Sequence, residues 1–166
     1  MRLTSYTDYA LRTLMFLALN RDKLVTIQDI ADAHKIAKNH LSKVVHHLSV
    51  AGLIESVRGR NGGLKLNREP GDINIGEVVR LTESDFFMAE CFDPDNTNCI
   101  YSTSCALKGV LNRATAAFLD VLDGVTLDSF LQKDITRTKV KNGKPVTVYF
   151  KETSYRKKAA TPSHKN

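Results

Sequence analysis

The 166-residue sequence contains no apolar run that approaches the ~20 residues needed to cross a bilayer. Its most apolar stretch, residues 11–19, is interrupted by Arg12 and Thr13. The N-terminus also lacks the succession of a cationic segment, an apolar run and a small-residue cleavage site that is typical of an export signal. We therefore expect a cytoplasmic protein that does not enter the membrane.

Motifs of catalysis are missing as well. The sequence has no nucleophile elbow, no phosphate-binding glycine loop and no paired-carboxylate motif. A cysteine nucleophile would need a histidine base, and no histidine occurs between His47 and His164. These absences predict that the protein is not an enzyme.

Cysteine is scarce, and the 3 copies lie within 15 residues as Cys91-x7-Cys99-x5-Cys105. Three thiolates on one loop can converge on a soft metal centre, either an iron–sulfur cluster or zinc. Zinc sites usually bring cysteines in C-x2-C pairs, so the wider spacing favours a cluster; unrelated thiols or a thiol redox switch are the alternatives. A four-iron cluster needs a fourth ligand, which must be oxygen, solvent or a residue from elsewhere in sequence.

Charge is distributed unevenly along the chain. Residues 1–68 contain 11 Lys and Arg against 5 Asp and Glu, residues 69–134 contain 4 against 12, and residues 135–166 contain 9 against 1. The basic N-terminal segment favours a polyanionic partner such as nucleic acid. We expect residues 135–166 to be a disordered tail that either adds phosphate contacts or aids solubility.

Hydrophobic periodicity predicts three helices in the first fifty residues. The first covers about residues 5–19, where Ser5 and Asp8 have the spacing of a capping pair. The second begins after Thr26, a favourable N-cap, and a third follows over about residues 38–50 after a tight turn. Two helices packed across such a turn form a helix-turn-helix.

A hairpin follows the third helix. Residues 53–57 and 64–66 favour β-structure and flank a glycine-rich tip that contains Asn61-Gly62. A helix-turn-helix followed directly by a hairpin is a winged helix. The predicted fold is therefore mainly α, with a small β-hairpin wing.

The remaining elements are helical. Residues 75–82 are predicted to form a short helix, and residues 104–122 a long amphipathic one that stops at Gly124. We expect the long helix to pair with its own copy, giving a homodimer suited to two-fold DNA sites; the alternative is that it folds back on the head. Thr126 is expected to cap a last short helix.

These elements divide the chain into three predicted parts. Residues 1–70 form the winged helix-turn-helix, residues 71–134 carry the cysteine loop and the dimerisation helix, and residues 135–166 are the basic tail.

Polar and basic side chains gather on the elements expected to meet DNA. The exposed face of the third helix enters the major groove in this geometry, arginines on a slim hairpin fit the minor groove, and a helix start suits phosphate. The predicted DNA-binding residues are Thr26, Gln28, Lys38, Asn39, His40, Ser42, Lys43, Arg58, Arg60, Asn61 and Gly62. His46 and His47 lie on the same exposed face but project about 100° apart, so we interpret them as surface or DNA-facing residues and not as metal ligands.

Four segments resemble those of the iron–sulfur winged-helix repressors. They are residues 3–12, residues 39–41, residues 58–63 and residues 75–80, and the resemblance covers residues 1–134. Some members of that family ligate iron through a histidine soon after the third cysteine. This sequence has none there, so its pattern is similar to that of the nitric-oxide-sensitive members.

The resemblance implies a cofactor and a signal. Cys91, Cys99 and Cys105 would hold a 4Fe–4S cluster, with 2Fe–2S as the alternative, and Asp8 of the partner subunit would be the fourth ligand. Arg12, one turn after Asp8, would orient its carboxylate. Nitric oxide would then release a dimeric repressor from operator DNA. The competing interpretations are a regulator of iron–sulfur or redox status, and a zinc-stabilised DNA-binding protein without sensing.

Overall fold

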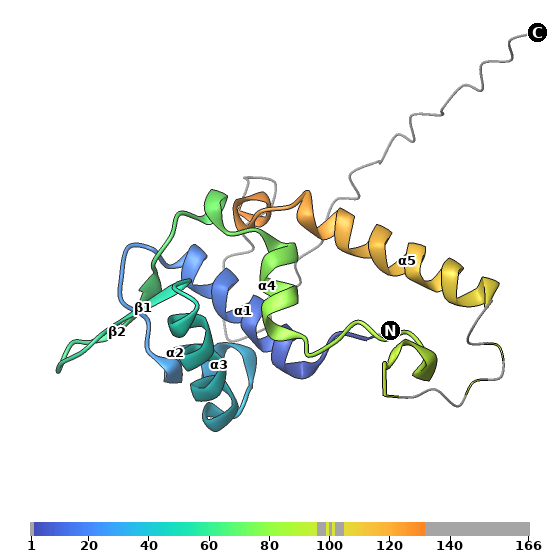
Figure 1. Cartoon of the computed structure of the whole chain (residues 1–166). Coiled ribbons are helices and arrows are strands. Elements are labelled where there is room, and N and C mark those ends of the chain that lie inside the picture. Colours follow the sequence, from blue (N-terminus) through green and yellow to red (C-terminus); the bar gives the residue numbers. More distant parts are fainter. Residues whose placement is uncertain (1, 96–98, 100, 102–104, 132–166) are drawn as a thin grey trace, which may run out of the picture. The chain divides into compact units, whose positions relative to one another are not determined.

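The computed structural model describes residues 2–95, 99, 101 and 105–131 (Figure 1). The predicted tail, residues 135–166, lies outside the described residues. The helices are α1 (Ser5–Leu19), α2 (Ile27–His34), α3 (Lys38–Val50), α4 (Ile75–Thr82) and α5 (Ala106–Asp123), with 3-10 turns η1 (Pro70–Asp72), η2 (Glu90–Phe92) and η3 (Leu127–Phe130) and strands β1 (Ile54–Val57) and β2 (Gly63–Leu66). Within this part of the chain, no helix is both long and apolar enough to span a membrane.

Helices α1–α3 surround one apolar core. The apolar side chains on both sides of the turn between α2 and α3 are buried: Ile30, Ala31, Ile36, Leu41, Val44 and Leu48. Leu14 and Leu17 of α1 pack in the same cluster, and so do residues of α4 and η3. The expected helix-turn-helix is therefore present, with α4 and η3 completing its core.

Local signals fix the turn between α2 and α3. Thr26 caps α2 through a full capping box, because its hydroxyl accepts from the Asp29 amide while the Asp29 carboxylate accepts from the Thr26 amide. Lys35 ends α2 with φ of 55°, in the left-handed region that usually favours glycine. The turn thus keeps its geometry although the sequence places a lysine there.

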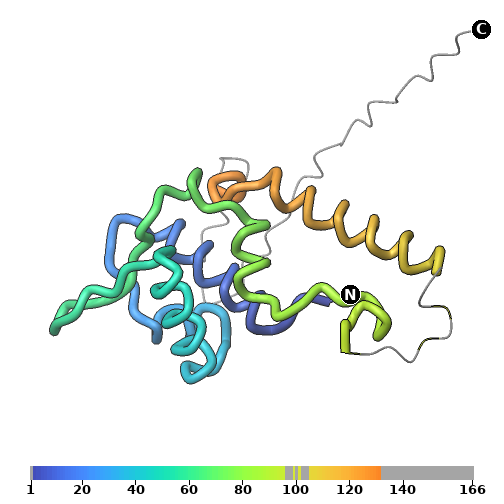
Figure 2. Tube along the Cα trace, in the orientation of Figure 1, coloured from blue at the N-terminus to red at the C-terminus, as the bar shows by residue number. Residues whose placement is uncertain are grey.

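The wing is an antiparallel pair, with β1 and β2 in register from Ile54 opposite Leu66 to Val57 opposite Gly63. The connecting tip spans residues 58–62, and its left-handed position is Gly59, with φ of 122°. A Cβ atom on Gly62 would meet the Val57 carbonyl oxygen, so only glycine fits this tip without a shift. Figure 2 shows the hairpin extending from the α1–α3 bundle.

The start of α1 differs from the prediction. Thr4 and not Ser5 is the N-cap: its hydroxyl accepts from the Thr7 amide at 3.3 Å. The Glu83 carboxylate accepts from the Thr4 amide at 2.8 Å and from its hydroxyl at 3.1 Å, which anchors the start of α1 to the segment after α4. Asp8 therefore takes no part in the cap. The prediction was wrong because a local spacing rule cannot tell which of two adjacent hydroxyl residues begins the helix.

Helix α5 is attached to α4 at its C-terminal end. The Arg80 guanidinium donates to the Asp123 carboxylate, with Nη2 2.7 Å from Oδ2, and the Asn74 side-chain amide donates to the Asp123 carbonyl at 2.7 Å. A Cβ atom on Gly76 would collide with the same carboxylate, so glycine leaves the space for this pair. Gly124 ends the helix as predicted, and η3 follows Thr126 as a 3-10 turn.

Candidate DNA-binding and metal-binding sites

The N-terminal half of α3 presents a polar, exposed face. Its predicted DNA-binding residues Lys38, Asn39, His40, Ser42 and Lys43 are all exposed. The Ser42 hydroxyl donates to the Lys38 carbonyl at 3.0 Å, so it is already engaged within the helix. The groups on this face that are exposed and available to contact a ligand are the two lysine ammonium groups, Asn39 and His40.

The prediction that His47 lies on that exposed face is wrong. Its side chain is half-buried, and its Nδ1 atom lies 3.1 Å from the Tyr6 hydroxyl of α1. The His47 ring is tilted against the Tyr6 ring, with 5.9 Å between their centroids. His46 is exposed, so of the two adjacent histidines only His46 fits the surface interpretation.

The wing tip holds two unpaired cations. Arg58, Arg60 and Asn61 are exposed, and neither arginine forms an ion pair with any acidic residue that the structure describes. Lys65 on β2 is different, because its ammonium pairs with Glu55 across the hairpin at 3.1 Å. The free charge of the wing is therefore concentrated at the tip.

The two predicted contacts at the start of α2 are engaged within that helix. The Thr26 hydroxyl belongs to the capping box, and the Gln28 side-chain amide donates to the Asp32 carboxylate at 2.8 Å. Hydrogen bonds from the Thr26 backbone and then its hydroxyl lower the pKa of Asp29. Both side chains are therefore engaged within α2, and their contact with DNA stays a prediction.

The cysteines lie in and around a loop whose two ends are joined by Lys108. The Lys108 ammonium donates to the Cys91 carbonyl at 2.7 Å, and the Lys108 amide donates to the Cys105 sulfur at 3.4 Å. Cys105 is the N-cap of α5, as its predicted place at a helix start requires. Lys108 was not among the predicted site residues, although its position one turn after Cys105 was a usable signal.

All three cysteines are half-buried and free of disulfides, which fits the donor chemistry of a soft metal centre. Among the residues that can be described, no three metal-binding side chains come together in one place. Most of the loop between Cys91 and Cys105, namely residues 96–98, 100 and 102–104, falls outside that set. Lys108 thus contacts both Cys91 and Cys105 at the base of this loop, whereas the three cysteines are not gathered at one point in the described part of the chain.

Asp8 lies on the surface of α1 and pairs with Arg12, whose Nε donates to its carboxylate at 3.0 Å. The two side chains are 45% and 46% exposed, so the carboxylate is accessible to a second molecule. With Thr4 as the N-cap, Asp8 is not part of the capping pair that its spacing from Ser5 predicts. The contact predicted between Arg12 and Asp8 is confirmed.

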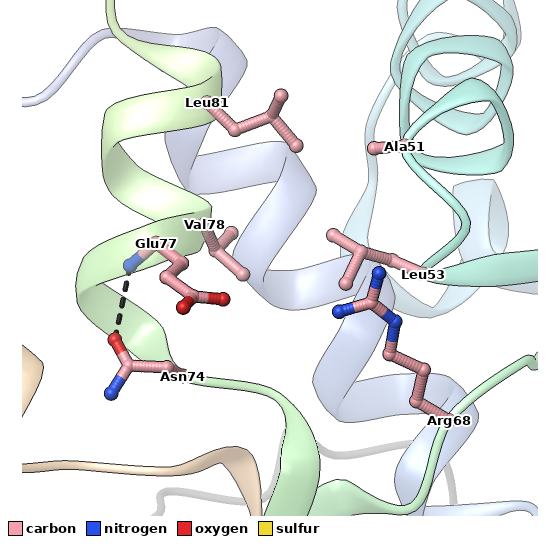
Figure 3. A pocket seen from close by; sticks show the side chains of 7 residues that line it. All are labelled: Ala51, Leu53, Arg68, Asn74, Glu77, Val78 and Leu81. Atoms are coloured by element: carbon pink, nitrogen blue, oxygen red, sulfur yellow. Dashed lines mark hydrogen bonds between the residues drawn. The ribbon is translucent and has the colours of Figure 1, made fainter.

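A separate open cavity of about 190 Å³ lies between α4 and the end of α3 (Figure 3). It is lined by Ala51, Leu53, Arg68, Asn74, Glu77, Val78 and Leu81. None of these residues is a predicted DNA or metal contact, and Asn74 is already engaged because its side-chain oxygen caps α4 by accepting from the Glu77 amide at 3.0 Å.

A helix-turn-helix with a basic wing, extended by a cysteine loop and a long helix, defines a winged-helix transcription regulator. Residues 3–133 match the Rrf2 family, described as iron-dependent transcriptional regulators. The chain belongs to this family, which consists of regulators and not of enzymes.

Relatives of similar length share about half of its residues. The chain is 54% identical over 132 residues to the HTH-type transcriptional regulator NsrR of Bacillus licheniformis, covering 79% of this chain and 92% of that protein. It is 53% identical over 128 residues to NsrR of Bacillus subtilis, covering 76% and 88%.

Solved structures have the same fold. T. potens IscR superposes with a TM-score of 0.64 at 26% identity, covering 79% of this chain and 86% of that one. The oxidised form of Staphylococcus aureus CymR gives a TM-score of 0.66 at 28% identity, covering 80% and 98%. The predicted winged-helix architecture is thereby confirmed.

Proposed function

We propose that this protein is a dimeric, nitric-oxide-sensing repressor that acts in the cytoplasm and loses its operator DNA when its iron–sulfur cluster reacts with nitric oxide. The observation that carries the proposal is the set of three free, half-buried cysteines on a loop closed by Lys108. The 54% identity to a regulator named NsrR supports the same conclusion.

Cys91, Cys99 and Cys105 would hold the cluster, of the 4Fe–4S type or alternatively 2Fe–2S. Asp8 of the second subunit would supply the fourth ligand, and Arg12 would hold its carboxylate in place through the contact at 3.0 Å. When bound, the cluster offers one iron that a carboxylate ligates less firmly than thiolates would, and that is open to a small diatomic molecule. Asp8 then ties α1 of one subunit to the cysteine loop of the other.

Helix α5 supplies the surface for the homodimer in this proposal. None of its residues is buried in the single chain, although it carries an apolar stripe. Leu107, Val110 and Val121 are 64%, 49% and 49% exposed, an arrangement that burial against a second α5 would relieve. Residues 1–70 would then be the reading head, residues 71–134 the sensing and dimerisation part, and residues 135–166 the tail.

The first experiment is to purify the protein without oxygen, measure iron, sulfide and the visible spectrum, and titrate nitric oxide. We expect a broad brown absorption that bleaches. Cys91→Ser, Cys99→Ser and Cys105→Ser should each lose it, and Asp8→Ala should weaken it, whereas Asp22→Ala, which removes an exposed carboxylate just beyond α1, should not. A colourless zinc protein, or a cluster indifferent to nitric oxide, would contradict the proposed sensing.

DNA binding by the wing is tested separately. Replacing Arg58 and Arg60 together by alanine should weaken binding by about tenfold or more and flatten its salt dependence, because phosphate contacts release counterions. Lys65→Ala is the matched control on the same hairpin, since its charge is already paired with Glu55. Equal losses in both variants would remove the wing tip from the interface.

A further inference from the structure

The first turn of α1 contacts the recognition helix α3 through one hydroxyl group. The Tyr6 hydroxyl lies 3.3 Å from the Lys43 carbonyl oxygen, to which it donates, and 3.1 Å from His47 Nδ1. Both partners are on α3, and the side chains of Tyr6 and His47 are half-buried. A polar bridge therefore adds to the apolar packing that holds α3 against α1.

The bridge can be fully satisfied. A phenol has one hydrogen and can also accept, so Tyr6 can donate to the Lys43 carbonyl while accepting from His47 Nδ1–H. The δ-protonated neutral imidazole and the imidazolium both supply that hydrogen. Burial raises the pKa of Tyr6, which keeps the phenol protonated. The geometry thus persists in either charge state of His47.

The bridge holds the backbone of a residue whose side chain is exposed. Lys43 offers its ammonium to the solvent on the DNA-facing side of α3, while its carbonyl is fixed by Tyr6. One turn along α1, the Tyr9 ring contacts the ring of His40, with 6.4 Å between centroids. No hydrogen bond of the Tyr9 hydroxyl is present among the described residues, so Tyr6 alone adds a directional contact here.

Asp8 projects from a different side of α1. At about 100° per residue, the side chains of Tyr6 and Asp8 are about 200° apart around the helix. The first two turns of α1 therefore contact α3 on one side and carry the Asp8–Arg12 pair on the other.

We propose that Tyr6 is a positioning residue that couples α1 to the recognition helix: its hydroxyl fixes where α3 lies along α1, and it transmits a displacement of α1 at Asp8 to Lys43 and its neighbours. The positioning of α3 requires only that the winged helix binds DNA. The transmission rests on the proposed function of Asp8 at a cluster.

The first test compares Tyr6→Phe with Tyr9→Phe, which removes from the same helix a hydroxyl that forms no hydrogen bond with any described residue. The probe is a duplex that the wild-type protein selects from a randomised DNA library, against an unselected duplex. Tyr6→Phe should bind the selected duplex roughly two- to tenfold more weakly and the unselected duplex equally well. Tyr9→Phe should match the wild type on both, and thermal unfolding should show that all three proteins fold.

A double-mutant cycle separates positioning from direct contact. His47→Leu should weaken binding to the selected duplex as Tyr6→Phe does, and the double variant should show no further loss. Additive losses would mean that His47 contacts DNA itself, which overturns the assignment of the bridge. Unchanged binding by Tyr6→Phe would overturn it as well.

Nitric oxide distinguishes this inference from the proposed function. If wild-type binding weakens after nitric oxide, Tyr6→Phe should show a smaller ratio of affinities before and after treatment, and an unchanged ratio overturns the transmission. If wild-type binding does not respond, the sensing proposal fails. The untreated Tyr6→Phe affinity then still decides whether Tyr6 positions α3.

Discussion

Helices α1–α3 and helix α5 carry apolar stripes of the same kind, yet only the first three bury theirs. Leu14, Ile30 and Leu41 have no exposed surface, whereas no residue of α5 is buried and Leu107 is 64% exposed. The amphipathic pattern of α5 is as regular as that of α1, so periodicity by itself did not decide which helix joins the core.

The difference lies in what each helix meets. Helix α1 contacts α2, α3, α4 and η3, while α5 contacts α4 near its own C-terminal end, where Arg80 pairs with Asp123. Helix α5 packs on the head near its C-terminal end and meets the cysteine loop through Lys108 at its start, and neither contact buries its apolar stripe. The contrast teaches that in this chain the head is stabilised by its own core, and it leads us to expect that α5 requires a second copy.

The largest effect should come from the core of the head. Leu14→Ala removes a side chain with no exposed surface and should lower the free energy of unfolding by about 2–5 kcal/mol, through lost burial and the cavity left behind. Chemical denaturation of the whole protein measures it, with Leu107→Ala as the counterpart in α5 at low protein concentration. Similar losses in both variants would end the contrast between the two regions.

Next in size is the loss of self-association. Val110→Asp places a charge on the apolar stripe of α5 and should weaken the proposed dimer on the order of a hundredfold, because a carboxylate is costly to bury. Asn112→Asp adds the same charge to another side of the helix and serves as control. Sedimentation equilibrium should show a monomer only for Val110→Asp; an undisturbed dimer would place its interface elsewhere.

A smaller change is expected at the cap of α2. Thr26→Ala removes the hydroxyl of the capping box and should cost about 1 kcal/mol of stability. Thr115→Ala removes a hydroxyl that donates to the Leu111 carbonyl on α5, at 3.2 Å, and should stay within about 0.5 kcal/mol. Urea titrations of both variants measure which one loses more stability. A larger loss in Thr115→Ala than in Thr26→Ala would show that capping contributes little to the head.

The smallest effect concerns acid. Side-chain hydrogen bonding by Arg80 lowers the pKa of Asp123, so this carboxylate stabilises the fold above its ordinary pKa of about 3.9, and the contribution is lost as the pH falls further. The protection of amides in the last turn of α5, taken as their exchange rate relative to the intrinsic rate at each pH, should therefore fall below about pH 4. Asp123→Asn should flatten that pH dependence, and a wild-type profile that is already flat would contradict it.

Much of the head followed from local rules. The N-cap at Thr26, the helix over Lys38–Val50 and the hairpin around a glycine-rich tip were predicted and found. The cap of α1 was not, since Thr4 and Ser5 are both good N-cap residues and the choice depends on Glu83, which is 79 residues away. The same limit applies to His47, whose burial depends on Tyr6 and not on its neighbours in α3.

The candidate site divides in the same way. The soft-metal loop that the cysteine spacing indicates stays a prediction, whereas the exposed residues of α3 and the wing were found where the pattern put them. The contact of Lys108 with the Cys91 carbonyl needed the loop to fold back on the first turn of α5. The spacing of Lys108 from Cys105 is a signal for its contact with the Cys105 sulfur, but not for its contact with Cys91.

The sequence by itself determined the helices, the hairpin and the clustering of cysteines, because periodicity, capping and turn preferences act over a few residues. Only the tertiary structure decided that Thr4 meets Glu83, Tyr6 meets His47 and Arg80 meets Asp123, which are 79, 41 and 43 residues apart. Partners so distant are chosen by how the packed elements meet, and that depends on the whole core and not on any local pattern.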